Sequence, residues 1–274
     1  MAVDHGFHPP NSVTWKVNSE SVLLLGGGRA LLMQLAHPLV AQGVADHSDF
    51  QARPLRRLNR TMDLTLKLVF GTKSEAREAV RQINHAHQSV RGVLDGSRDP
   101  RTDEVTYSAM DPELLLWVHA TLVDSALLAY GRYVAPLSDA ECRAYYTESK
   151  LVGRLLGIPE DAFPADYAGF QDYVSSMIGG GPVVVGELAR QLARSILAPP
   201  IPLLPPLVFA PLNIITTGLL PPVLRQGYRL AWGSRQQAVF ALEERIIRRL
   251  VSRAPRLVRQ VAPARAASRR YPVS

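Results

Sequence analysis

The stretch from Thr72 to Leu94, TKSEAREAVRQINHAHQSVRGVL, decides the fold class expected for this chain. Its core-facing positions recur at alternating spacings of four and three residues, at Ala76, Val80, Ile83, His87, Val90 and Leu94. This period is typical of an α-helix with one buried side. Thr72 and Glu75 have the spacing of a capping box, which marks the helix start. The pattern predicts a helix that carries His87 on its apolar side.

A second histidine, His85, cannot share a metal ion with His87 on this helix. Two residues correspond to a rotation of about 200° around the helix axis, so the two imidazoles face opposite sides. The sequence also contains no His-x-x-x-His or Glu-x-x-His pair, which non-haem iron sites commonly use. A metal bound in this region is therefore expected to take a single imidazole.

The preceding segment, residues 55–70, is predicted to be a helix with a cationic first half, which contains Arg57 and Arg60. Thr61 lies one turn after Arg57, at the spacing i, i+4. Cations opposite a lone histidine suit an anionic planar cofactor whose metal takes one imidazole, and haem b with its two propionates is such a cofactor. A histidine on an apolar side is also often a hydrogen-bonded core residue. The spacing alone leaves both interpretations open.

Two short elements in this region resemble a known family. Arg57-Leu-Asn-Arg60-Thr61 and His87-Gln-Ser-Val-Arg91 resemble the Arg-x-x-Lys-Thr and His-x-x-Val-Arg elements of the rubber oxygenases, or latex clearing proteins. Three further stretches are similar to an uncharacterised bacterial branch of this family, which also includes the membrane-bound oxygenase of mycophenolic acid biosynthesis: Gly26-Gly-Gly-Arg-Ala-Leu-Leu-Met-Gln-Leu-Ala-His37-Pro38, Ala45-Asp-His-Ser-Asp-Phe50 and Leu116-Trp-Val-His119-Ala-Thr-Leu-Val-Asp124-Ser125. The resemblance is good from Trp15 to Tyr173.

The resemblance implies an all-α protein with a globin-like core that binds haem b. It implies that His87 is the proximal iron ligand and that Arg57, Arg60 and Thr61 belong to the haem pocket. It also implies an oxygenase that uses dioxygen on an apolar small molecule, isoprenoid or aromatic. Arg60 and Thr61 are then expected to contact bound oxygen or the propionates through hydrogen bonds.

The chain departs from the family pattern at two places. Where the rubber oxygenases carry a lysine that can reach the distal side of the iron, this chain has Arg60, whose guanidinium stays protonated and has no lone pair to offer. The sixth coordination site is therefore expected to be open or filled by water or dioxygen. The family also has a pocket glutamate, and no glutamate stands at the matching distance before Arg57. Asp46 and Asp49 are the nearest carboxylates.

Another histidine competes with His87 for the metal. Asp111-Pro112-Glu113 is a clear helix start, and on the helix that follows Leu115, His119, Leu122 and Ala126 share one side. Because the resemblance aligns His87 with the proximal ligand, we expect His119 to be a distal partner that relays protons. The alternative, in which His119 binds the metal, stays open.

The glycines Gly26, Gly27 and Gly28 are unusual within a predicted helix, because each costs roughly 1 kcal/mol relative to alanine. They do not form a dinucleotide or Walker loop, since neither Gly-x-Gly-x-x-Gly nor Gly-Lys-Ser/Thr is present. Close approach of a haem face or of a crossing helix would explain them equally. After them, His37 precedes Pro38, and this pair predicts that the helix bends or ends there.

The composition predicts one domain over residues 1–274, with a core at about residues 15–253. The chain is 47% hydrophobic, and no linker divides it. Its lone cysteine, Cys142, rules out an internal disulfide, and a Cys-x-x-Cys-His haem attachment is absent. No charged and apolar leader precedes Ser19, so a cytoplasmic protein, with membrane association as an option, is expected.

The formal net charge of +7 comes from the C-terminal part, which has 12 arginines and only two acids from Arg225 onward. Residues 254–274 are predicted to form a flexible basic tail. Peripheral contact with anionic lipid would suit this charge. A nucleic-acid partner is not expected, because the basic region lacks interleaved aromatic residues and matches no nucleic-acid module.

The segment from Ser195 to Leu224 has no charged residue and contains eight prolines. Prolines interrupt the run of about 20 helical residues that a membrane-spanning helix needs, so this segment is not expected to cross a bilayer. It is predicted to form an apolar belt on the core or an exposed lip for a membrane or an apolar substrate.

Two functions from other classes are compatible with the same residues. In the first, the protein binds haem without oxygenating a substrate and acts as a haem carrier or a gas sensor. In the second, the helical core binds lipid and no haem, and the glycines only pack helices.

Overall fold

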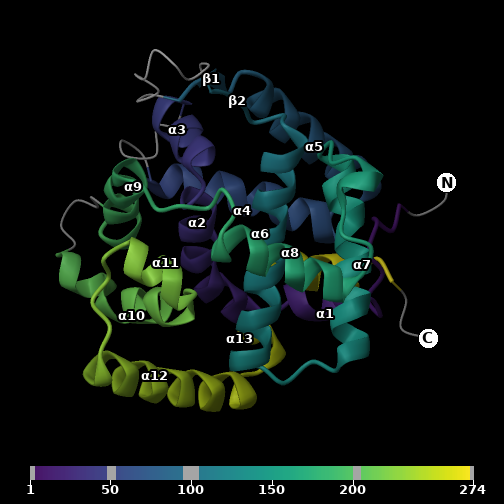
Figure 1. Ribbon diagram of the computed structural model, residues 1–274. Helices are drawn as coiled ribbons and strands as arrows, with labels where there is room; N and C mark the ends of the chain where they lie inside the picture. Colours follow the sequence, from purple (N-terminus) through teal and green to yellow (C-terminus); the bar gives the residue numbers. More distant parts are fainter. Residues whose placement is uncertain (1–3, 48–53, 95–104, 200–204, 272–274) are drawn as a thin grey trace.

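The computed structural model describes residues 4–47, 54–94, 105–199 and 205–271, without the side chains of residues 54–58 and 206. In these ranges the chain is almost entirely helical, with one two-stranded antiparallel hairpin in which Gly92 pairs with Tyr107 (Figure 1). The prediction of an all-α fold is therefore confirmed.

The first half of the chain contains α1 (Val13–Asn18), the 3-10 helix η1 (Ser21–Gly26), α2 (Gly27–Leu35), α3 (Pro38–His47), α4 (Pro54–Phe70), α5 (Lys73–Gln88), β1 (Arg91–Val93), β2 (Thr106–Ser108) and α6 (Pro112–Tyr133). The second half contains α7 (Asp139–Leu155), η2 (Glu160–Ala162), α8 (Tyr167–Gly179), α9 (Glu187–Leu197), η3 (Pro206–Phe209), α10 (Ala210–Leu219), α11 (Pro222–Gly227), α12 (Ser234–Arg253), α13 (Arg256–Arg259) and α14 (Ala262–Ser268).

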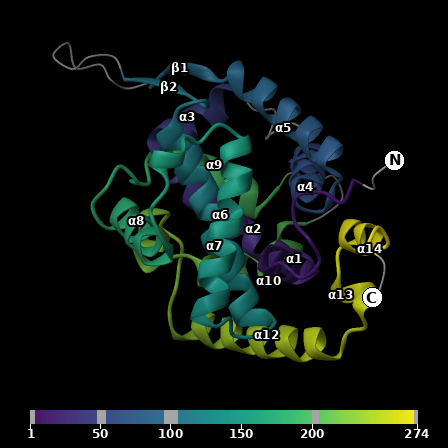
Figure 2. The same cartoon turned by 90° about the vertical axis from the view of Figure 1, so that its right-hand side faces the viewer.

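Helix α6 forms the centre of the molecule, and η1, α2, α7, α8 and α12 all pack against it (Figures 1 and 2). It begins as predicted, with Asp111 accepting a hydrogen bond from the backbone N–H of Glu113 and with Pro112 in the first turn. Trp117 and Tyr133 on it are fully buried. By length and composition α6 could cross a membrane, but two thirds of its apolar window, 67%, is buried by the protein's own helices.

The glycine stretch packs crossing helices together. A Cβ atom on Gly26 would lie 3.1 Å from the carbonyl oxygen of Ser125 on α6. A Cβ on Gly28 would lie 2.4 Å from Oγ1 of Thr216 on α10. The neighbours of these two glycines are therefore helices. The sequence left open whether a haem face or a crossing helix approaches the glycines, and at both positions it is a crossing helix.

A buried arginine in the same stretch joins three helices. The guanidinium of Arg29 on α2 pairs with Asp124 at 2.5 Å and donates to Oγ of Ser125 at 2.7 Å, both on α6. Its Nε donates to the carbonyl oxygen of Leu219 at the end of α10 at 2.8 Å. The planar guanidinium reaches three separate acceptors from three different nitrogens, whereas a lysine would present all its donors from one nitrogen. The Gly-Gly-Gly-Arg motif is thus a packing element.

The predicted break at His37 and Pro38 is present. The helical run from Ser21 to Leu35 and helix α3 meet at 104°. Pro38 begins α3, and His37 is buried in the bend.

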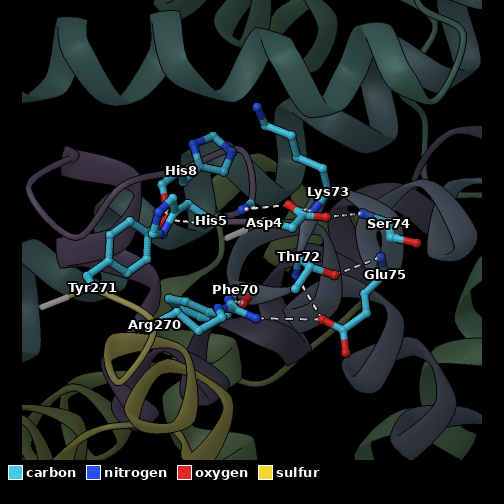
Figure 3. A network of polar contacts seen from close by, with 11 residues as sticks. Asp4, His5, His8, Phe70, Thr72, Lys73, Ser74, Glu75, Arg270 and Tyr271 are labelled. Carbon is cyan, nitrogen blue, oxygen red and sulfur yellow. Dashed lines mark hydrogen bonds and ion pairs between the residues drawn. The ribbon is translucent and has the colours of Figure 1, made fainter. Parts of the chain in front are cut away.

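Residues near both ends of the chain form hydrogen bonds with the turn between α4 and α5 (Figure 3). The carboxylate of Asp4 accepts hydrogen bonds from the backbone N–H groups of Lys73 and Ser74 at 2.7 and 3.1 Å. The guanidinium of Arg270 donates to the carbonyl oxygen of Phe70, the last residue of α4. Acceptors at a helix N-terminus and donors at a helix C-terminus satisfy groups that the helices themselves leave free.

The basic C-terminal segment corrects one expectation. Ala264 and Ala267 of α14 are buried against Trp15 and Phe70, with the ring of Tyr271 beside them. Helix α14 is therefore packed on α1 and α4, and Arg259 of α13 pairs with Glu20 beside η1, although the composition of residues 254–274 predicts a flexible tail. Alanines at spacing three allow α14 to approach the aromatic rings closely, and a count of charges misses this contact.

The proline-rich segment, where it is described, has a buried and an exposed apolar part. Ile215 and Leu219 of α10 are buried against α6 and α12. Leu207 in η3 is 81% exposed, and Leu212 in the first turn of α10 is exposed as well. The segment thus forms an apolar wall on the core with an exposed apolar edge.

Candidate functional site

His87 lies in the last turn of α5. The predicted helix is present, and its first turn has the predicted capping box of Thr72 and Glu75. Its side chain is half-buried, and its Nδ1 is buried without a hydrogen-bond partner among the described residues. Oδ1 of Asn84, one turn earlier on the same helix, is buried and unpaired as well. Buried polar atoms without partners are costly, and the few that occur in folded proteins often mark a ligand site.

The protonation state of His87 suits a metal ligand. Burial lowers the pKa of His87 below its usual value, because the charged imidazolium loses its hydration. At neutral pH the imidazole is therefore uncharged, which is the form that binds metals.

Helices α4 and α5 form a hairpin that is closed near its turn and open at its far end. Leu64 and Leu68 of α4 pack against Ala79 of α5, so the side near the turn is buried. Towards the other end Arg60 and Thr61 are exposed, and His87 is only half-buried. The open end of this hairpin is the place where the candidate residues gather.

The lengths of the two helices bring Arg57 and His87 to the same end of the hairpin. Both stand about 20 Å from the turn at a rise of 1.5 Å per residue, and Arg60 stands about one helical turn closer to it. The backbone of Arg57 belongs to α4, while its side chain lies outside the described part. The backbones of Arg57 and His87 thus lie towards the same end of the hairpin, and whether their side chains share a site stays a prediction.

The end of α5 is braced by the β1–β2 hairpin and α3. The N–H of Val90 donates to the carbonyl oxygen of His87 at 3.0 Å, and the N–H of Ala109, just after β2, donates to the carbonyl oxygen of Val90 at 2.9 Å. Gly43 on α3 fits between the side chains of Val90 and Tyr107, where its own Cβ would lie only 3.3 Å from each. These contacts fix the backbone that follows His87.

Asp46, one of the two carboxylates expected near the pocket, is engaged in this brace. Tyr107 donates its hydroxyl proton to Asp46 at 2.5 Å, and the side-chain amide of Gln42 donates to it at 3.0 Å. Burial and the neighbouring carboxylate raise the pKa of Tyr107 to about 12. Tyr107 was not singled out from the sequence, because only the folded hairpin brings it to Asp46. Asp49 lies outside the described residues.

His119 is the most deeply buried of the proposed site histidines. It lies on α6 with 8% of its surface exposed, its Nε2 has no partner among the described residues, and its ring meets that of Phe163 edge-on at 6.0 Å. Burial lowers the pKa of His119 to about 4, so it is neutral at pH 7. None of the contacts found in the described chain joins His119 to α5.

The side of α6 that carries His119 is closed at one end and open at the other. Leu115, one turn before His119, is 6% exposed, whereas Leu122, about one turn after it, is 46% exposed. Neighbouring elements therefore do not close over this part of the central helix. An apolar molecule that entered here would meet leucine and phenylalanine side chains and one neutral imidazole.

Residues with metal-binding side chains do not cluster elsewhere in the described ranges. In them, no group of three or more His, Cys, Asp or Glu side chains gathers as a set of ligands for a metal ion. His8 and His37 are also buried, each with one ring nitrogen unpaired, but they lie in separate places in the chain. A metal site in this part would thus have at most two such side chains as ligands.

A family comparison agrees with the motifs. Residues 15–253 match the family described as ER-bound oxygenase mpaB/B'/rubber oxygenase, catalytic domain. The chain belongs to this family. Two uncharacterised mycobacterial proteins, Rv2237 of Mycobacterium tuberculosis and Mb2261 of Mycobacterium bovis, are each 33% identical to it over 222 residues, which cover 77% of this chain and 81% of each relative. No solved structure matches the chain.

As a member of the mpaB/rubber oxygenase family, the chain carries an oxygenase catalytic domain. All five candidate residues, Arg57, Arg60, Thr61, His87 and His119, lie within the matched region. Helices α13 and α14 lie beyond the matched region. The contacts of α14 with Trp15 and Phe70 therefore join a segment outside the family domain to residues inside it.

Proposed function

We propose that the protein is a haem b-dependent oxygenase that uses dioxygen to oxidise an apolar small molecule, with His87 as the single protein ligand of the iron. The observation that supports this most is a neutral imidazole with a buried, unpaired nitrogen at the open end of a helical hairpin, within an oxygenase catalytic domain. Single-imidazole ligation is common in haem proteins.

The residues at the open end of the hairpin fit such a cofactor. The imidazole of His87 would hold the iron, and Arg57 and Arg60 on α4 would bind the propionates through charge-assisted hydrogen bonds. When bound, haem supplies the iron centre at which dioxygen is activated. The brace formed by Asp46 and Tyr107 would keep the backbone that follows His87 in place.

The region around His119 would receive the substrate. Leu115, Leu122 and Phe163 offer an apolar surface there, which suits an isoprenoid or an aromatic molecule. His119 is neutral at pH 7, so one of its ring nitrogens donates and the other accepts, and it can relay a proton without becoming charged. Thr61 is the hydroxyl on α4 that would hydrogen-bond a ligand on the iron.

Haem binding is tested by the visible spectrum of the purified protein after reconstitution. We expect a Soret band at about 400 nm, as for haem proteins in general. His87→Ala should lose the band, and added imidazole should restore it. His85→Ala is the matched control, because His85 is exposed on the same helix and faces away. A wild-type protein that takes up no haem would refute the proposal and favour the lipid-binding alternative.

Catalysis is tested separately by oxygen uptake with isoprenoid and aromatic candidate substrates. Uptake that depends on substrate and disappears in His87→Ala would support an oxygenase. Haem binding with no uptake for any candidate would favour the haem carrier or gas sensor. If His119→Ala removed the Soret band while His87→Ala kept it, the ligand assignment would be wrong.

A further inference from the structure

Helix α12 is attached to the protein along one side only. It lies along the lower edge of the molecule in both views, outside the other helices (Figures 1 and 2). Its inner side is fixed by Phe240, which is buried against α6 and α10, and by Ile247. Glu244 forms an ion pair with Arg132 of α6, with 2.7 Å between the carboxylate oxygen and the guanidinium nitrogen. These contacts fix which side of α12 faces away from the core.

The outer side of α12 carries an apolar stripe. Its members are Val239, Leu242, Ile246 and Leu250, which are 39%, 53%, 48% and 65% exposed. Their spacings of three and four residues place them in one row along the helix. On α13, Leu257 and Val258 are 69% and 67% exposed and extend the set of exposed apolar residues. Rows of this length are seldom left open on a protein surface without a partner.

Arginines border this stripe. Arg245, Arg249 and Arg253 lie next to it on α12, and Arg235, Arg248 and Arg256 are also exposed on these two helices. Among the ion pairs of the described residues, none involves any of these six arginines. The two acids of α12 are half-buried, and Glu244 is already paired. The outer surface of α12 and α13 therefore presents apolar side chains among unneutralised positive charges.

We propose that the outer surface of α12 and α13 docks the protein on an anionic lipid bilayer, with the helix axis parallel to the membrane. An apolar row bordered by arginines matches the boundary between acyl chains and acidic headgroups, where leucine side chains enter the apolar layer and guanidinium groups reach phosphates. The inference rests on the exposed side chains of these helices and does not depend on haem binding.

The positive charge of this surface favours an anionic bilayer over a second copy of the chain, and its apolar row favours a bilayer over a nucleic acid. A second copy of the chain would bring two arginine-bordered surfaces together with no acidic groups to compensate them. A nucleic acid would leave the leucine row in water, because phosphates offer no apolar surface. An anionic bilayer satisfies both the charges and the apolar row.

The docking surface is tested by co-sedimentation of the full chain with lipid vesicles. We expect binding to phosphatidylcholine vesicles that contain about one third phosphatidylglycerol, and a partition coefficient at least about a hundredfold lower on phosphatidylcholine alone, because several arginines act together. Binding to the anionic vesicles should weaken as salt is raised.

Two triple variants separate the apolar and the charged contributions. Leu242→Gln/Ile246→Gln/Leu250→Gln should reduce partitioning on anionic vesicles by at least about tenfold, because the inserted side chains are lost. Arg245→Gln/Arg249→Gln/Arg253→Gln should reduce it by about a hundredfold. The matched control, Val93→Gln/Val105→Gln/Val184→Gln, replaces exposed apolar residues outside α12 and α13 and should bind as the wild type does.

Three results would overturn the proposal, once circular dichroism shows that the variants are folded. The first is a wild-type protein that does not sediment with anionic vesicles. The second is unchanged binding of the leucine-to-glutamine variant. The third is a wild-type dimer, seen by analytical ultracentrifugation, that the same variant converts to a monomer, since the stripe would then be an interface between copies.

Discussion

Replacing Gly28 by alanine is expected to destabilise the protein, whereas the same change at Gly27 is not. A Cβ on Gly28 would lie 2.4 Å from Oγ1 and 2.9 Å from Cγ2 of Thr216, while ordinary contacts begin at 3.4 Å. Thr216 is only 2% exposed, and rotating its side chain would exchange one crowded atom for the other. Helices α2 and α10 must therefore separate by a fraction of an ångström to about one ångström.

The size of the effect follows from two opposing contributions. Overpacking of this kind costs about 1–3 kcal/mol. Alanine gains up to about 1 kcal/mol over glycine within a helix. Gly28→Ala should thus lower the free energy of unfolding by about 1 kcal/mol. Gly27 has no atom within 4 Å of its would-be Cβ, so Gly27→Ala should leave stability unchanged or raise it by a few tenths of a kcal/mol.

Urea unfolding followed by circular dichroism measures both variants. The double variant Gly28→Ala/Thr216→Ala should be more stable than the sum of the two single changes predicts, because removing Oγ1 and Cγ2 relieves the clash. Equal stabilities of the Gly28 and Gly27 variants, or strict additivity with Thr216→Ala, would refute the helix-crossing explanation of the glycines.

Three further predictions follow from buried charges and contacts. The pKa of His119 is lowered from 6.5 to about 4 in the folded protein, so the unfolded chain binds the proton more readily. About 3 kcal/mol of folding stability, fully present above pH 6.5, should therefore be lost as the pH falls from 6.5 to 4. His119→Leu should remove this part of the pH dependence in unfolding experiments. Asp124→Ala should cost about 3 kcal/mol by leaving Arg29 without its carboxylate, and Arg29→Met/Asp124→Ala should cost less, as double-variant unfolding would show. Arg270→Ala should cost about 1 kcal/mol and increase hydrogen exchange at the end of α4, because the carbonyl oxygen of Phe70 loses its donor; unchanged exchange there would contradict the role of the C-terminal segment.

Local signals predicted the elements that carry the candidate site. The capping box at Thr72 and the spacing around His87 fixed α5, and the proline after His37 fixed the bend between α2 and α3. Asp111 and Pro112 fixed the start of α6. Each of these features depends on residues within about one helical turn of one another, so the sequence is sufficient to predict them.

Contacts between segments that are distant in the sequence could not be predicted from such local patterns. The hydrogen bond between Tyr107 and Asp46 joins residues that are far apart in the chain, and it engages one of the two carboxylates nearest to the expected pocket. The folded C-terminal segment was missed for the same reason, because α14 is ordered by Trp15 and Phe70 near the other end of the chain.

The sequence by itself determined that the protein is helical, that it belongs among these oxygenases, and that Arg57 and His87 stand at the same end of a helical hairpin. Only the tertiary structure decided what approaches Gly28, how deeply His119 is buried, and which side of α12 is left open. The physical reason is that periodicity and capping act along the chain, whereas burial and desolvation depend on which other helices pack against a residue.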